Sequence, residues 1–130
     1  MILRDPNRIK IVSGGERAGK SATGGWEGYS SHIAEATMTQ KPTLYWLIGE
    51  DYEMARGEFQ YLIDYFTEID MVAKDGIHFP KADQAILSTR MDGRFETKTA
   101  HDPRKLGVRA PHGVIGCEVG LWTPETWLRA

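Results

Sequence analysis

Residues 14–21 constrain the fold of this chain more than any other segment. Their letters, GGERAGKS, match the phosphate-binding pattern GxxxxGK[ST] at every fixed position. The preceding residues 8–13 (RIKIVS) are short and β-branched, which is typical of a buried strand, and a helix is expected from about Gly19 to about Ala36. The pattern binds phosphate when it lies between a strand and a helix. The sequence therefore predicts an α/β fold with an anion site at the start of this helix.

The chemistry of such a loop follows from its residue types. Glycines let the backbone curl so that successive N–H groups point at phosphate oxygens, and the positive end of the following helix adds to the attraction. We expect Lys20 to contact the β- and γ-phosphates of ATP and the Ser21 hydroxyl to bind the bridging Mg²⁺. The residues predicted to contact the nucleotide are Gly14, Gly15, Glu16, Arg17, Ala18, Gly19, Lys20, Ser21 and Ala22.

Two charged residues within the loop have open roles. Arg17 would stabilise charge developing on the γ-phosphate, as an arginine finger does, or its side chain would face solvent. The sequence does not decide between these alternatives. Glu16 is expected to face solvent.

A P-loop ATPase also needs acids at the end of another core strand, one in the metal shell and one that orients water. Residues 113–117 (GVIGC) are predicted to form such a strand, and Glu118 follows it. We predict Glu118 as the water-activating residue, the alternative being an ordinary strand end. Cys117 stands where the metal-associated aspartate is expected, and as the lone cysteine it is otherwise expected to be a small core residue.

The rest of the chain alternates strand and helix patterns. The predicted elements are a strand at 43–48, a helix at 51–68, a hairpin of 85–90 and 94–98 around 91–93 (MDG), a helical turn at 103–106 and a short helix at 123–128. We expect a three-layer sandwich of the P-loop NTPase type, with a mostly parallel sheet covered on both faces and the hairpin as an insertion. The polar positions of the second helix, Glu53, Glu58, Asp64 and Glu68, are expected to form a solvated face.

Bulk properties fit one domain spanning residues 1–130. The 16 basic and 18 acidic residues leave a net charge of −2, so any contact with DNA must be local. No signal peptide or membrane-length apolar run is present in the sequence. The four histidines lack metal-ligand spacing, and the four tryptophans are expected in the core rather than in a basic cluster.

Three segments in order resemble the ATPase domain of the phage terminase large subunit. The first is 13–21 (SGGERAGKS), and the second is 44–62 (LYWLIGEDYEMARGEFQYL), which looks like the family's strand and helix with a W-x-x-G/A-P-x-y-x-x-A-R pattern. The third, 91–128, is similar to the family's short hairpin, its "pxxLrG" segment and its Walker B strand with an acidic end. The resemblance covers most of the chain.

This resemblance implies that ATP hydrolysis drives double-stranded DNA through a portal into a procapsid. It implies Lys20 and Ser21 on the nucleotide, Glu118 in the place of the Walker B glutamate, and Arg17 as the P-loop arginine, with Lys20, Arg17 and Glu118 acting in catalysis. The implied partners are double-stranded DNA, the portal protein, the small terminase subunit and further copies in a homo-oligomeric ring, with no membrane. The implied location is the host cell cytoplasm, transiently at the portal vertex of the procapsid.

The chain departs from the family pattern in three ways. Arg17 lies three residues before Lys20, where many members have four, and Cys117 replaces an aspartate. The family's coupling motif and nuclease domain do not follow residue 130, so we expect a fragment or a truncated gene product. Two other functions stay open, namely a nucleotide-binding module without turnover and a P-loop small-molecule kinase. The arginines that a kinase lid would use are Arg90, Arg94, Arg104 and Arg109.

Overall fold

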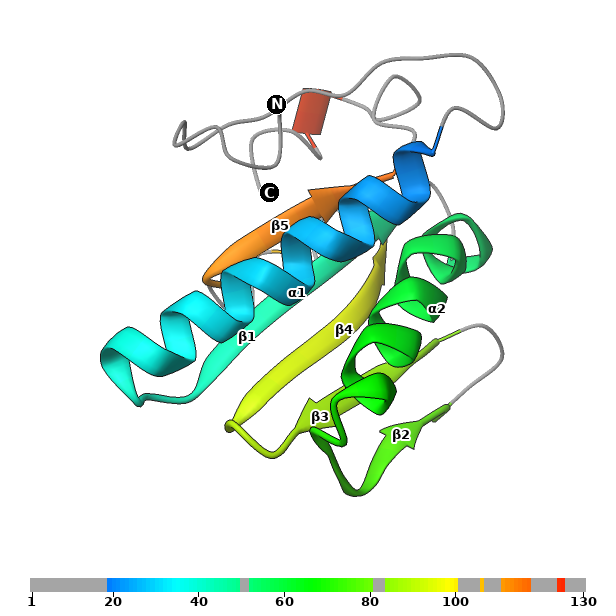
Figure 1. The fold of residues 1–130 in the computed structure, drawn as a ribbon. Helices are drawn as coiled ribbons and strands as arrows, with labels where there is room; N and C mark the ends of the chain where they lie inside the picture. Colours follow the sequence, from blue (N-terminus) through cyan, green and yellow to red (C-terminus); the bar gives the residue numbers. More distant parts are fainter. Residues whose placement is uncertain are drawn as a thin grey trace.

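The computed structural model describes residues 19–49, 52–80, 84–100, 106, 111–117 and 124–125 of the chain (Figure 1). The helices and strands within these residues are α1 (Lys20–Thr39), β1 (Thr43–Gly49), α2 (Tyr52–Glu68), β2 (Val72–His78), β3 (Ile86–Thr89), β4 (Gly93–Thr99) and β5 (Gly113–Gly116). The predicted α/β class is confirmed, and the predicted bounds of β1, α2 and β5 agree with the structure to within one residue. The predicted strand at 8–13 lies outside the described residues, as do most of the predicted turn at 103–106 and short helix at 123–128.

The five strands form one mixed sheet in the order β2-β3-β4-β1-β5. The core strands are parallel, because β1 pairs in parallel with both β4 and β5, while β3 pairs antiparallel with β4 and with β2. The predicted hairpin exists as β3 and β4, with Asp92 in the left-handed conformation at its turn (φ 57°). The hairpin is not an insertion, however. Strand β4 is central, because it pairs with β1 from Thr43↔Gly93 to Gly49↔Thr99 on one edge and with β3 on the other.

Strand β2 was not predicted from the sequence. Its letters, VAKDGIH, contain a charged pair and a glycine, which disfavour a strand. These residues suit an edge strand, where charges and irregular backbone discourage pairing with other chains. The register of β2 shifts between Val72 and Ile77, and Asp75 has a φ of 53°. The segment is a strand because β3 offers a free edge, not because of its own propensity.

Both described helices lie side by side on one face of the sheet (Figure 1). Between them and the sheet is a core of buried side chains in which Phe59, Leu62, Phe66 and Phe95 are fully covered. The opposite face buries a second cluster, formed by Leu44, Trp46, Ile48, Ala100 and Leu106. The described residues therefore show one helical layer on the sheet, and the three-layer arrangement stays a prediction.

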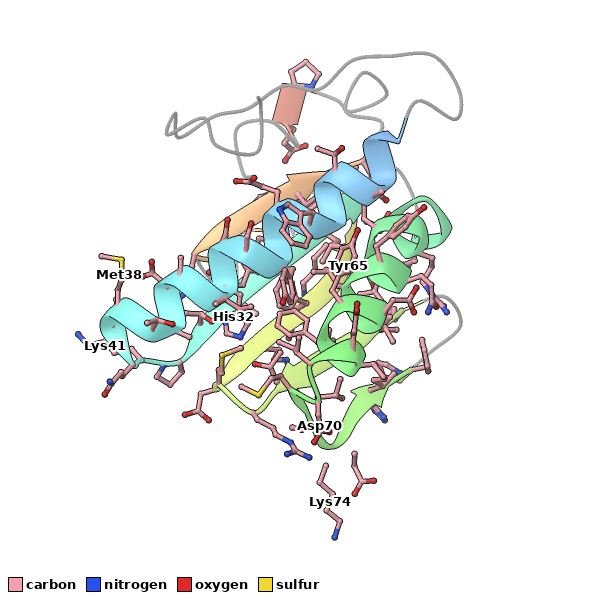
Figure 2. All side chains as sticks on the ribbon, viewed as in Figure 1. His32, Met38, Lys41, Tyr65, Asp70 and Lys74 are labelled. Carbon is pink, nitrogen blue, oxygen red and sulfur yellow. The ribbon has the colours of Figure 1, made fainter. Side chains whose placement is uncertain are left out.

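His32 joins α1 to the sheet from a fully buried position, between the helix and the strands (Figure 2). Its Nε2 lies 2.7 Å from Thr89 Oγ1 and its Nδ1 lies 3.0 Å from Thr43 Oγ1. A neutral imidazole carries one N–H, so one threonine hydroxyl accepts a hydrogen bond from the ring and the other donates one to it. Burial lowers the pKa of His32 to about 4, which keeps the ring neutral near pH 7. This histidine is a core residue.

Candidate functional site

The residue before α1 is a glycine in the left-handed conformation. Gly19 is the N-cap residue, in the left-handed conformation with φ 82° and ψ 17°, and helix α1 begins directly after it at Lys20. A φ in this region favours glycine, since a Cβ is strained there. A Cβ built at Gly19 would have no atom within 4 Å, so backbone conformation and not crowding selects glycine here.

The first turn of α1 can attract an anion. No side chain of the described residues caps it, and the turn contains no acidic residue. The first N–H groups of a helix have no partner within the helix, and the helix dipole places positive charge there. Lys20 and Ser21 are the first two residues of this helix, as predicted, and Ala22 follows them. Residues 14–18, including Glu16 and Arg17, lie outside the described residues.

The carboxyl ends of the parallel strands lie at the same end of the sheet as the start of α1 (Figure 1). Strand β1 ends at Gly49, whose carbonyl accepts a hydrogen bond from Ala100 N at 2.7 Å, and Cys117 N donates to Ile48 O at 2.7 Å. In open α/β sheets, ligands bind outside the carboxyl ends of the strands. The structure therefore brings the predicted loop end and the end of β5 to one edge of the molecule.

Three glycines of α1 let the helix approach its neighbours closely. A Cβ at Gly28 would lie 2.7 Å from Ile115 Cδ1, and one at Gly25 would lie 2.6 Å from Tyr61 Cβ. A Cβ at Gly24 would lie 3.2 Å from Glu58 Cγ and 3.4 Å from Ile115 Cγ2. These close contacts compensate for the low helix propensity of glycine. The three glycines allow the first turns of α1 to pack closely on α2 and β5.

Cys117 is a buried thiol, only 3% exposed, and belongs to the core cluster under the helices. The expectation that it is a small core residue is confirmed. It lies at the carboxyl end of β5, where a metal-associated acid was expected, so the described part of this strand end supplies no carboxylate. Glu118 lies outside the described residues, and its predicted role stays a prediction.

Glu58 was wrongly assigned to a solvated face. It is only 9% exposed, and its side chain lies in the junction between α1 and α2, beside Gly24. Helical spacing alone placed it among the polar positions of α2. The spacing within α2 does not show that α1 covers this side of it, where the glycines of α1 allow the two helices to approach closely.

Aromatic side chains surround the outer rim of the same junction. Trp26 lies 5.2 Å from Tyr29 and 5.6 Å from Tyr65 between ring centroids. The Tyr65 hydroxyl donates to the carbonyl of Ala22 at 3.4 Å, and Tyr65 extends from α2 toward α1 (Figure 2). Trp26 is 41% exposed, whereas Trp46 is fully covered. The prediction that the tryptophans lie in the core is therefore confirmed for Trp46 and wrong for Trp26. Trp122 and Trp127 lie outside the described residues.

The remaining histidines do not form a metal centre in the described part of the chain. His78 and His112 are exposed and belong to separate strand regions, and His112 Nδ1 accepts a hydrogen bond from Leu44 N at 3.0 Å. His101 lies outside that part. No group of three or more histidine, cysteine, aspartate or glutamate side chains within it is arranged to hold a metal ion. No helix that the structure describes is long and apolar enough to cross a membrane.

Comparison of the chain with protein-family models, with curated proteins and with solved structures finds no match. The function must therefore be argued from the residues and the geometry of this chain.

Proposed function

We propose that the chain binds ATP with Mg²⁺ at the N-terminus of α1. The observation that carries the proposal is that the sequence motif and the left-handed backbone conformation agree at Gly19. The second fixed glycine of the GxxxxGK[ST] pattern has a φ of 82°, and a helix that no described side chain caps begins directly after it. Exposed N–H groups at the start of a helix are a general phosphate-binding arrangement.

The residues at this position fit a nucleotide and its metal. The loop backbone and Lys20 would hold the phosphates, and the Ser21 hydroxyl would contribute to the metal shell. Mg²⁺ keeps several waters and is bound through one or two carboxylates together with substrate phosphates, so it does not need a cluster of protein ligands. When bound, it neutralises charge on the β- and γ-phosphates.

Binding is tested with Lys20→Ala and a matched lysine substitution. Lys41→Ala removes an exposed lysine just beyond the other end of the same helix. We expect the ATP affinity, measured by calorimetry with Mg²⁺, to fall about 10- to 100-fold in Lys20→Ala and to be unchanged in Lys41→Ala. Loss of one charge-assisted phosphate contact accounts for such a fall. Undiminished ATP binding in Lys20→Ala would contradict the proposed site.

We further propose that the chain hydrolyses ATP, with Glu118 orienting the water and Arg17 stabilising charge on the γ-phosphate. The alternative is nucleotide binding without turnover, which the buried thiol of Cys117 at the end of β5 favours. Single-turnover hydrolysis separates the two. Turnover in the wild type that is lost in Glu118→Gln, with ATP still bound, contradicts the binding-only alternative. ATP binding without any turnover contradicts hydrolysis by this chain.

The finer proposal is the ATPase domain of a viral terminase large subunit that packages double-stranded DNA. Its support is the order of segments that resemble the family, together with a strand at 43–49 that leads into a helix containing Ala55 and Arg56. The portal protein, the small terminase subunit and a ring of full-length chains are its proposed partners, in the host cell cytoplasm and at the procapsid. Stimulation of ATP hydrolysis by double-stranded DNA tests this assignment. ATP turnover that DNA and added copies of the chain leave unchanged would contradict it.

A further inference from the structure

Four aromatic side chains form a rim along the outer side of the junction between α1 and α2. Trp26 and Tyr29 come from α1, and Tyr61 and Tyr65 come from α2. Trp26 is 41% exposed and Tyr61 is 39% exposed, although both are large aromatic side chains. Single exposed apolar residues are ordinary on protein surfaces, but a contiguous group of them marks an interaction site. This aromatic rim is therefore a candidate binding surface.

The rings of the aromatic rim hold one another in place. The ring centroid of Trp26 lies 5.2 Å from that of Tyr29 and 5.6 Å from that of Tyr65, and Tyr29 lies 5.5 Å from Tyr65. The Tyr65 hydroxyl also donates to the carbonyl of Ala22 at 3.4 Å, which fixes Tyr65 across the junction (Figure 2). Tryptophan and tyrosine side chains that are ordered before binding lose little entropy when a partner binds, and they contribute strongly to binding energy.

None of the described rings stacks flat on Trp26. Tyr29 is tilted by 41° to the indole, and Tyr65 meets it edge to face at 87°. A planar group of a partner can therefore stack on the exposed part of the indole. Tryptophan is the aromatic side chain that attracts cations most strongly, and guanidinium groups are the cations that stack best on rings. The chain contains one such contact already, because the guanidinium of Arg56 lies 4.7 Å from the centroid of the Phe79 ring.

The acids beside the aromatic rim give it a negative charge. Asp64 and Glu68 are exposed and lie three residues after Tyr61 and Tyr65, the spacing that places side chains next to one another on a helix. Burial, and then the neighbouring Tyr61 and Asp64, raise the pKa of the Tyr65 hydroxyl, so Asp64 lies close to this ring. In the part of the chain that the structure describes, no ion pair involves Asp64 or Glu68. The charge of this surface therefore attracts a cationic partner and repels a nucleic acid.

We propose that the aromatic rim binds an arginine-containing segment of a partner protein. Arginine side chains stack on the exposed rings, and their charges pair with Asp64 and Glu68. Arginine suits this surface better than lysine, because its guanidinium is planar and more weakly hydrated than an ammonium group. This binding does not require the proposed nucleotide site.

The test measures binding of a synthetic peptide of alternating arginine and glycine residues. A second peptide, with lysine in place of each arginine, has the same charge but lacks the planar group. Calorimetry gives the affinity, and the NMR signal of the Trp26 indole N–H reports contact at the rim. The variants are Trp26→Leu, which keeps an apolar side chain without a ring, Trp26→Phe, which keeps a ring, and Asp64→Asn.

Two matched controls change exposed residues away from the aromatic rim. Met38→Ala removes a side chain that is 84% exposed near the other end of α1. Asp92→Asn removes an exposed acid at the turn between β3 and β4, where asparagine tolerates the φ of 57°. Circular dichroism compares the folding of all variants with that of the wild type.

We expect Trp26→Leu to weaken binding of the arginine peptide about 5-fold, through loss of a cation–ring contact. Trp26→Phe should retain part of the affinity, because phenylalanine is a weaker partner for cations than tryptophan. Asp64→Asn should weaken binding about 3-fold, the effect of losing one exposed ion pair. The lysine peptide should bind the wild type more weakly than the arginine peptide does. Both controls should bind the arginine peptide as the wild type does.

Other outcomes would overturn the proposal. If the arginine peptide does not shift the Trp26 signal, or if Trp26→Leu binds it as the wild type does, the rim is not its site. Equal weakening by either control would indicate general apolar or charge attraction. If the wild type binds single-stranded oligothymidylate and Trp26→Leu does not, the rim is a nucleic-acid surface instead. If sedimentation shows self-association that Trp26→Leu abolishes, the rim is an interface between copies of the chain.

Discussion

The imidazole of His32 occupies the space that any side chain at Gly93 would need. A Cβ built on Gly93 would overlap the ring atoms of His32. The Gly93 N–H also donates to Thr89 Oγ1 at 3.1 Å, the hydroxyl that contacts the same ring. We therefore expect Gly93→Ala to destabilise the fold by about 2–4 kcal/mol, the range for overpacking a core and breaking a buried polar network. Urea denaturation measures the free energy of unfolding.

A double substitution separates the overlap from other effects at position 93. His32→Ala removes the ring, so Gly93→Ala should cost less in that background than in the wild type. A coupling energy of at least about 1 kcal/mol is expected for residues in such contact. Additive effects of the two substitutions would show that the ring does not limit position 93.

Burial of His32 also predicts a specific loss of stability in acid. Its folded pKa of about 4 lies below the unfolded value of 6.5, so the unfolded chain takes up the proton first as the pH falls. The stabilising contribution is present above about pH 6.5 and is lost between pH 6.5 and pH 4, with a total of about 3 kcal/mol. Urea denaturation at several pH values should give a shallower pH dependence for His32→Gln than for the wild type. Equal slopes would contradict the buried neutral ring.

Local patterns account for much of the fold. Strand β1 follows from a short apolar run and is buried at all seven positions, while α2 follows from the helical spacing of the apolar residues that form its covered face. The turn at Asp92 likewise follows from an Asp-Gly pair that tolerates a positive φ. These features depend on neighbours within a few residues, which the sequence displays directly.

Other features depend on partners distant in the chain. Strand β2 forms on an edge that β3 supplies, and β4 is central because β1 pairs with it. The residues within each of these two strands do not predict either pairing. Glu58 is covered by α1, whose glycines have a low helix propensity when they are judged from the sequence alone. The start of α1 after Gly19 could be placed from the motif, while the burial of Glu58 could not, because it depends on a different helix.

The close contact of α1 with α2 predicts an unusual preference for glycine within a helix. Alanine normally stabilises an exposed helix position by about 1 kcal/mol relative to glycine. At Gly25, a Cβ would lie 2.6 Å from Tyr61 Cβ and would force the helices apart, so Gly25→Ala should destabilise the fold by about 1–2 kcal/mol. Ala34 is exposed on the same helix, and Ala34→Gly should cost about 1 kcal/mol. Thermal and urea denaturation compare the two, and a stabilised Gly25→Ala would contradict the contact.

The left-handed Gly19 predicts separate effects on stability and on nucleotide binding. Because a Cβ there meets no atom within 4 Å, Gly19→Ala should cost only backbone strain, about 1–2 kcal/mol. Asparagine tolerates this conformation better, so Gly19→Asn should be closer to the wild type in urea denaturation without nucleotide. Both variants should weaken ATP binding by calorimetry, because a side chain obstructs approach of the phosphate to the backbone. If Gly19→Asn binds ATP as the wild type does, close backbone approach at this glycine is not needed.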